Sequence, residues 1–147
     1  MAEKISLCSI GILLGVQTLF DLNDKKIPDV VTMLGSVIGI VCLCFEKRSA
    51  LEIILALLPG MVCVLYAKLS REALGYGDAC FICVMGLFYS FEELLRILLI
   101  AFGVAGMAAL VLCTVFHRPR KYEIAFFPFL YLAYGSDVLV RIANGRL

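Results

Sequence analysis

Six runs of apolar residues, none of them containing a charged side chain, alternate with short polar segments along the chain. They cover residues 5–20, 30–45, 53–67, 79–91, 97–116 and 124–136. Such runs are typical of membrane-spanning helices, although several are shorter than the roughly 20 residues that a bilayer requires, so flanking residues must extend them. The pattern therefore predicts six transmembrane helices joined by short loops.

The composition agrees with this pattern and excludes several classes of protein. Of the 147 residues, 63% are hydrophobic and 17% are charged, and a soluble domain of this size has too little interior to bury so much apolar surface. This disfavours a soluble enzyme, a secreted disulfide scaffold and a disordered protein. The net charge of +1 shows no excess of basic residues of the kind that binds nucleic acid. We therefore expect an all-α, polytopic membrane protein with a single domain over residues 1–147, surrounded by membrane lipid.

The basic residues give a weak indication of how the chain is oriented in the membrane. Seven of them fall in the segments that follow the first, third and fifth runs, and six fall on the other side. The positive-inside rule favours a cytoplasmic position for the first set. The sequence thus predicts a multi-pass protein of the inner or plasma membrane, with both ends of the chain outside.

Two aspartates stand at ends of apolar runs that lie on the same side of the membrane. Asp21 follows the first run and Asp78 precedes the fourth. Because two crossings separate them, they share one membrane face, whereas Asp137 falls towards the opposite face. An ionisable residue at the end of a span is costly unless it is paired or hydrated, so it is a candidate functional residue. The alternative is that Asp21 is only a boundary charge.

Asp78 follows two glycines, in the segment Gly75-Tyr76-Gly77. Glycine allows positive φ and close approach of another backbone, so an extended peptide could reach the carboxylate behind such a turn. The alternative is an ordinary helix start in which the aspartate is the N-cap and the glycines form the loop.

Together the two aspartates suggest a specific chemistry. Two carboxyl groups a few ångströms apart cannot both ionise readily, so they share one proton. The ionised group can then take a proton from water while the protonated one polarises a carbonyl. This is the arrangement of an aspartic protease and it needs no cofactor. With one histidine in the chain, neither a metal cluster nor a Ser-His-Asp set is expected.

Two segments resemble motifs of the type IV prepilin peptidases, which are GxGD-type aspartyl membrane endopeptidases. The segment 21–29, DLNDKKIPD, resembles their D-x6-P-[ND] motif, and 75–78, GYGD, resembles their G-x-G-D motif. The resemblance covers about residues 5–135. It implies an enzyme that removes the basic leader of prepilins or pseudopilins at the cytoplasmic membrane face, with Asp21 and Asp78 as the catalytic pair.

The resemblance also implies residues that contact the substrate. Pro28 would fix the turn into the second span, and Gly75 and Gly77 would give the substrate backbone access to the site. Acidic residues of the first loop, Asp24 and Asp29, are expected to attract the basic leader, although screening by salt makes this a modest effect. The alternative is that Asp24 and Asp29 are ordinary charged residues of a solvated loop.

The chain departs from the family pattern at three places. Cys80 stands where members usually carry lysine, and the segment 125–129, AFFPF, keeps one proline of a P-F-G-P-F pattern and loses a proline and a glycine. The chain also starts almost directly at the peptidase core. It therefore resembles the short form associated with tight-adherence (Flp) pili or preflagellin processing, and we expect peptidase activity without methyl transfer.

Other interpretations remain open at this point. The aspartates could belong to a small transporter or channel subunit, or to an inactive assembly protein. A presenilin-type protease is disfavoured because its Tyr-Asp pair and Pro-Ala-Leu segment are absent. The Cys80-x-x-Cys83 pair is interpreted as packing, with redox or metal chemistry as the alternative. Gly103 and Gly106 suit close helix packing, although their spacing is not the usual small-xxx-small pattern.

Overall fold

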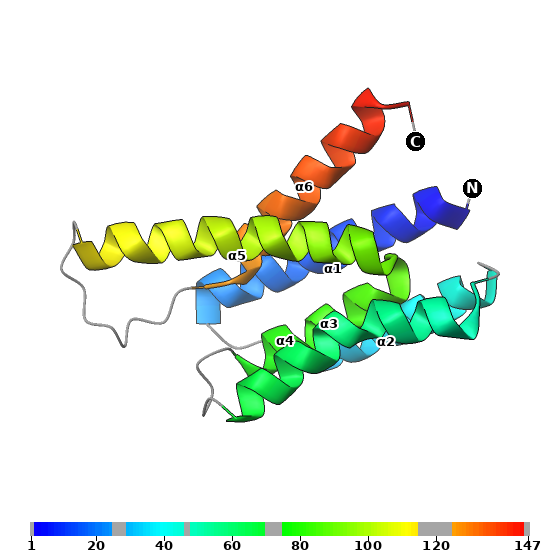
Figure 1. Ribbon diagram of the computed structural model, residues 1–147, viewed down its shortest axis with the longest axis horizontal. Helices are drawn as coiled ribbons and strands as arrows, with labels where there is room; N and C mark the ends of the chain where they lie inside the picture. The colour runs from blue at the N-terminus through cyan, green and yellow to red at the C-terminus, as the bar shows by residue number, and fades with distance from the viewer. Residues whose placement is uncertain (1, 25–28, 46–47, 70–74, 115–124, 146–147) are drawn as a thin grey trace.

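The computed structural model describes residues 2–24, 29–45, 48–69, 75–114 and 125–145, and these form six helices without a strand (Figure 1). Each predicted run corresponds to one helix. The helices are α1 (Ala2–Asp24), α2 (Asp29–Phe45), α3 (Ala50–Leu69), α4 (Tyr76–Phe88), α5 (Phe91–Thr114) and α6 (Phe127–Ala143).

The surface and the helix lengths are those of a membrane protein. In the described residues, α1, α3 and α5 each contain an apolar segment long enough to cross a bilayer, and α2 and α4 are shorter apolar helices. Large apolar side chains cover the outward faces, and Leu51, for example, is 73% exposed. Since a soluble protein rarely exposes extended apolar surface, the chain is an all-helical, polytopic membrane protein, as predicted.

Helices α3 and α5 begin several residues earlier than the charge-free runs predict. The reason is the same at both places. Ser49 and Glu52 exchange hydrogen bonds with each other's backbone N–H at the start of α3, at 3.3 and 3.1 Å. At the start of α5, Glu93 accepts from the N–H and hydroxyl of Ser90 at 3.1 and 2.8 Å. Ser-x-x-Glu is a helix-starting signal, so these acidic residues lie inside the helices.

Helix α4 ends at Phe88 with a break of two residues before α5. The guanidinium group of Arg48 donates to the carbonyl oxygens of Phe88 and Tyr89, both at 3.0 Å. These bonds satisfy carbonyl groups that have no partner within the helix. The chain then reverses, so that α5 runs back alongside the bundle.

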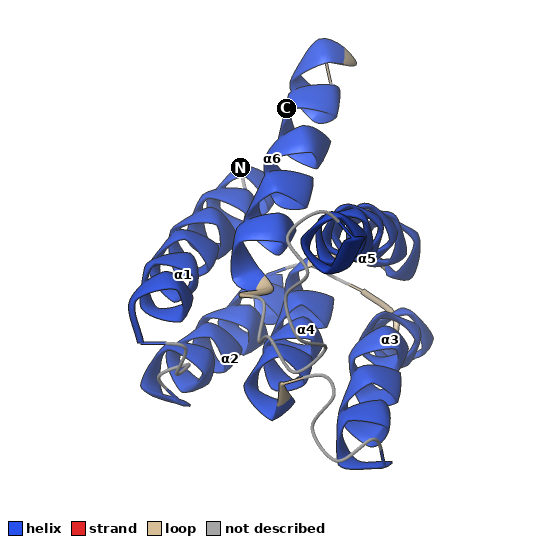
Figure 2. Ribbon diagram, turned by 90° about the vertical axis from the view of Figure 1, so that its left-hand side faces the viewer, coloured by secondary structure: helices blue, strands red, loops and turns tan. Residues whose placement is uncertain are grey.

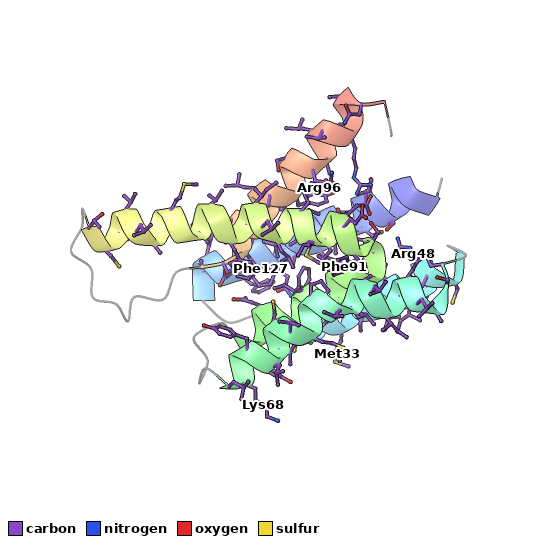
Figure 3. All side chains as sticks on the ribbon, in the orientation of Figure 1. Met33, Arg48, Lys68, Phe91, Arg96 and Phe127 are labelled. Carbon is purple, nitrogen blue, oxygen red and sulfur yellow. The ribbon has the colours of Figure 1, made fainter. Side chains whose placement is uncertain are left out.

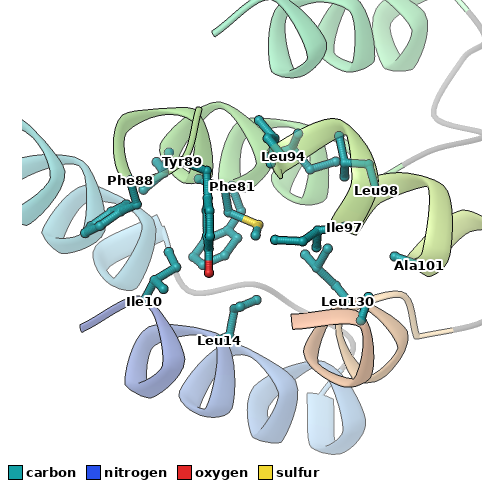
Figure 4. Packing of buried hydrophobic residues seen from close by; sticks show 14 of the residues in the cluster. Ile10, Leu14, Phe81, Phe88, Tyr89, Leu94, Ile97, Leu98, Ala101 and Leu130 are labelled. Carbon is teal, nitrogen blue, oxygen red and sulfur yellow. The ribbon is translucent and has the colours of Figure 1, made fainter. Parts of the chain in front are cut away.

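Helix α4 is the centre of the fold. It lies between α2 and α3, and α1, α5 and α6 complete its surroundings (Figure 2). Seven of its 13 residues are buried. Side chains from four helices and the Tyr89 bend meet in one apolar cluster (Figure 4), which includes Ile10, Leu14, Phe81, Met85, Tyr89, Leu94, Ile97 and Leu130. Because neighbouring helices cover most of its surface, α4 can be shorter than a lipid-exposed span.

Two glycines allow α3 and α4 to pack closely. A β-carbon on Gly60 would lie 2.6 Å from the backbone nitrogen and Cα of Cys83, and one on Gly86 would lie 2.5 Å from the carbonyl oxygen of Ala56. By contrast, a β-carbon on Gly103 or Gly106 would meet nothing within 4 Å. The close contact expected at the glycines of α5 is therefore made in the described structure by those of α3 and α4.

Candidate active site

Asp21 lies in the last turn of α1 and faces the interior of the bundle. Its side chain is buried, with the residue 8% exposed. The carboxylate oxygen Oδ2 accepts a hydrogen bond of 3.1 Å from the backbone N–H of Phe127, the first residue of α6. Figure 3 shows Phe127 near the middle of the bundle, where α6 begins. A segment more than 100 residues away in the chain thus supplies the donor for this carboxylate.

Asp78 is the third residue of α4 and is partly buried. Its carboxyl group lies close enough to that of Asp21 for the two charges to repel each other. The end of α1 and the start of α4 thus lie at one end of the bundle (Figure 1), and their two acidic groups are within electrostatic range of each other. Two acidic groups in this relation can divide the roles of proton acceptor and proton donor.

Gly75 precedes α4 and lies directly against the Asp78 carboxyl group. A β-carbon at residue 75 would lie 2.9 Å from Oδ2 and 3.3 Å from Cγ of Asp78. The backbone there has φ −54° and ψ 128°, which any residue can adopt, and Gly77 lies within the first turn of α4. In the described residues positive φ occurs at Gly145 and at no other glycine. Gly75 therefore provides space for the carboxylate rather than a left-handed turn.

Two polar residues of α1, which the sequence pattern does not single out, lie one turn before Asp21. Gln17 is fully buried and its Nε2 donates to the Thr32 hydroxyl of α2 at 3.1 Å. Its Oε1 is buried without a donor in the part of the chain that the structure describes. Thr18 donates to the carbonyl oxygens of Leu14 and Phe127, at 2.7 and 3.4 Å. The sequence does hold a signal for them, because Gln17 and Thr18 are polar residues within an apolar run and precede Asp21 by four and three residues, which places them near it on a helix.

Three further residues, Asp24, Pro28 and Asp29, are predicted from the sequence to contact the substrate. Pro28 lies outside the described residues. The structure describes Asp24 and Asp29 only as the last residue of α1 and the first residue of α2. Their proposed contact with a substrate leader stays a prediction from sequence.

Asp137 belongs to a separate group of charges at the other end of the bundle. Its Oδ2 lies 2.7 Å from Nε of Arg141, one turn later in α6, and its Oδ1 lies 3.7 Å from Nε of Arg96. Arg141 also pairs with Glu93 of α5 at 2.7 Å and lies over the Tyr89 ring. These pairs explain why α6 continues past Asp137, beyond the charge-free run, and they tie α6 to α5.

No group of three potential metal ligands occurs within the described ranges. Cys80 and Cys83 are free, half-buried thiols on α4, and Cys83 packs against Gly60 of α3. Cys83 therefore behaves as a small packing residue.

If the protein removes a leader peptide, as its resemblance to the prepilin peptidases implies, replacing Cys80 by serine is expected to leave the activity within about twofold of wild type, because the hydroxyl has nearly the size of the thiol and the half-buried position tolerates it. Initial rates of leader removal measure the effect. A loss as large as that for Asp78→Asn would show instead that the thiol takes part in the chemistry.

Comparison with known proteins assigns a family to this arrangement. Residues 8–112 match the model of the type IV leader peptidase family, and this range includes both Asp21 and Asp78. No curated protein and no solved structure matches the chain. Since the match covers well over half of the 147 residues, the chain belongs to the type IV leader peptidase family.

Proposed function

We propose that this membrane protein is an aspartic-type endopeptidase in which Asp21 and Asp78 form the catalytic pair. The observation that carries the proposal is that the buried Asp21, held by the Phe127 N–H at the end of α1, lies within electrostatic range of Asp78 at the start of α4. Each aspartate comes from the end of a helix that packs in the core, so the scaffold holds the pair in place.

The chemistry requires one ionised and one protonated carboxyl group. The ionised group removes a proton from a water molecule, whose oxygen attacks the carbonyl carbon of the scissile peptide bond. The protonated group transfers its proton to the carbonyl oxygen, which gives a gem-diol. A proton then passes to the amide nitrogen, the C–N bond breaks, and the carboxyl and amine products leave with the pair restored to its starting state.

The family and the position of the pair support a proposal for the substrate class. A prepilin carries a basic leader before an apolar helix, and we propose that Flp-type prepilins or preflagellin-like proteins are cleaved at this junction. The apolar helix would lie in the lipid beside the bundle, while Asp24 and Asp29 attract the leader and Pro28, Gly75 and Gly77 shape its path. The scissile segment must be extended, because a helix hides its carbonyl groups.

The distribution of basic residues supports a cytoplasmic position for the pair in the inner or plasma membrane. Seven basic residues fall in the polar segments on the side of Asp21 and Asp78. Of the six assigned to the other side, Arg96 and Arg141 lie inside helices α5 and α6 rather than in loops. The positive-inside rule then favours the first set as cytoplasmic.

Purified protein in detergent, mixed with a Flp-type prepilin, tests the proposal directly. We expect a shorter product on a gel, with a mass that places the cut between the basic leader and the apolar helix. A detergent solution holds no transmembrane gradient, so a transporter would show no reaction there. An intact prepilin under these conditions would contradict the proposed function.

Gly75→Ala is expected to lower the rate of cleavage by about tenfold or more, because small displacements of a catalytic group are costly. The added methyl group would lie 2.9 Å from Oδ2 of Asp78. That oxygen ends a flexible side chain, so the carboxylate turns away while the fold survives. Gly135→Ala, at a site with nothing within 4 Å, is the matched control. Wild-type activity in Gly75→Ala would show that the carboxylate does not need this position.

A further inference from the structure

The start of α6 is built so that its first N–H group points at Asp21. Its N-cap residue, Phe126, makes no side-chain hydrogen bond to the helix start. The second residue, Pro128, has no N–H, and the N–H groups of Phe129 and Leu130 bond to the carbonyl oxygen of Phe126 at 3.1 and 3.2 Å. The N–H of Phe127 bonds to Asp21. A carboxylate from α1 thus takes the place of the capping side chain that a helix usually carries.

Three neighbouring helices hold this N–H group in position. The Phe127 ring packs edge-on against Phe81 of α4, with centroids 5.1 Å apart, and Phe126 stacks on Phe102 of α5 at 4.9 Å. Thr18 of α1 contacts the carbonyl oxygen of Phe127. A donor fixed in this way needs no rearrangement when it acts on a charge.

We propose that the Phe127 N–H positions Asp21 and makes it the ionised member of the catalytic pair, which leaves Asp78 as the proton donor. A buried carboxylate requires hydrogen-bond donors, and here Asp21 receives one. Asp78 lies in the first turn of α4, where the helix dipole also favours negative charge. A direct hydrogen bond to a charged oxygen stabilises it more than that dipole does, so Asp21 is the base. This role rests on the proposed function.

The sharpest test replaces the amide between residues 126 and 127 by an ester. Phenyllactic acid introduced at position 127 keeps the ring and removes only the N–H. We expect the rate constant kcat for prepilin cleavage to fall at least tenfold while KM stays within twofold of wild type. The same ester at Phe91, the first residue of α5, is the matched control and is expected to cleave like wild type.

A second pair of variants covers the case in which the ester protein does not fold. Phe127→Pro and Phe127→Ala both lose the ring, but only proline also lacks the N–H, and proline suits the first position of a helix. We expect the alanine variant to cleave at least tenfold faster than the proline variant, with each rate expressed per folded protein.

The outcomes separate the positioning role from the proposed function. Wild-type kcat in the ester protein, or equal rates for the proline and alanine variants, would overturn the role of Phe127 while leaving the peptidase intact. A parallel Asp21→Asn protein that still cleaves would overturn the proposed function, and the positioning role with it.

Discussion

Asp21→Asn and Asp78→Asn are each expected to reduce prepilin cleavage by roughly a thousandfold or more, because each removes one half of a two-part proton transfer. The amide has nearly the shape of the carboxylate, and in the Asp21→Asn variant the amide oxygen would still accept the Phe127 N–H. The variants should therefore insert and fold. Gel mobility of a co-expressed prepilin, with the amount of folded enzyme measured in parallel, gives the result.

Glu92→Gln provides the matched control for these aspartate variants. Glu92 is an exposed acid in the first turn of α5, at the opposite end of the bundle from the pair. Its removal changes the net charge by the same amount, and we expect normal cleavage. If Asp21→Asn retained near-normal processing, the assignment of the pair would be wrong, whatever the control showed.

Gly86→Val is expected to have the largest effect on stability. Its β-carbon would meet the carbonyl oxygen of Ala56 at 2.5 Å, and a backbone atom within a helix cannot move aside. Overpacking of this kind lowers the free energy of unfolding by about 3 kcal/mol. In a chain of this size, that loss lowers the melting temperature by roughly 6–12 °C. Thermal unfolding in detergent measures it, and activity should fall too, because α4 carries Asp78.

Gly103→Val adds the same side chain to another apolar helix and is the comparison for Gly86→Val. A β-carbon at residue 103 meets nothing within 4 Å, so we expect almost no change in melting temperature. Equal effects of the two substitutions would show that α3 and α4 are not in close contact at Gly86.

The apolar runs were sufficient to predict six helices and the all-α membrane fold, because a bilayer excludes charges from its spans. Counting crossings predicts that Asp21 and Asp78 share one membrane face, and the helix ends that carry them lie at one end of the bundle (Figure 1). The absence of charged residues, used as the criterion for a span, misplaced the starts of α3 and α5, because Glu52 and Glu93 form caps there. A charge at a helix end can be a starting signal, and a rule based on charge alone cannot recognise it.

Contacts between helices were decided by the tertiary structure. In a membrane protein, the side chains that face lipid and those that face other helices are both apolar. Hydropathy therefore does not show how each helix is rotated about its axis or how it is aligned with its neighbours. For this reason Gly60 and Gly86, rather than Gly103 and Gly106, make the close packing. Likewise the hydrogen bond from Phe127 to Asp21 depends on where α6 begins against α1. The sequence by itself determined the helices and the order in which they cross, and only their packing decided what surrounds each carboxyl group.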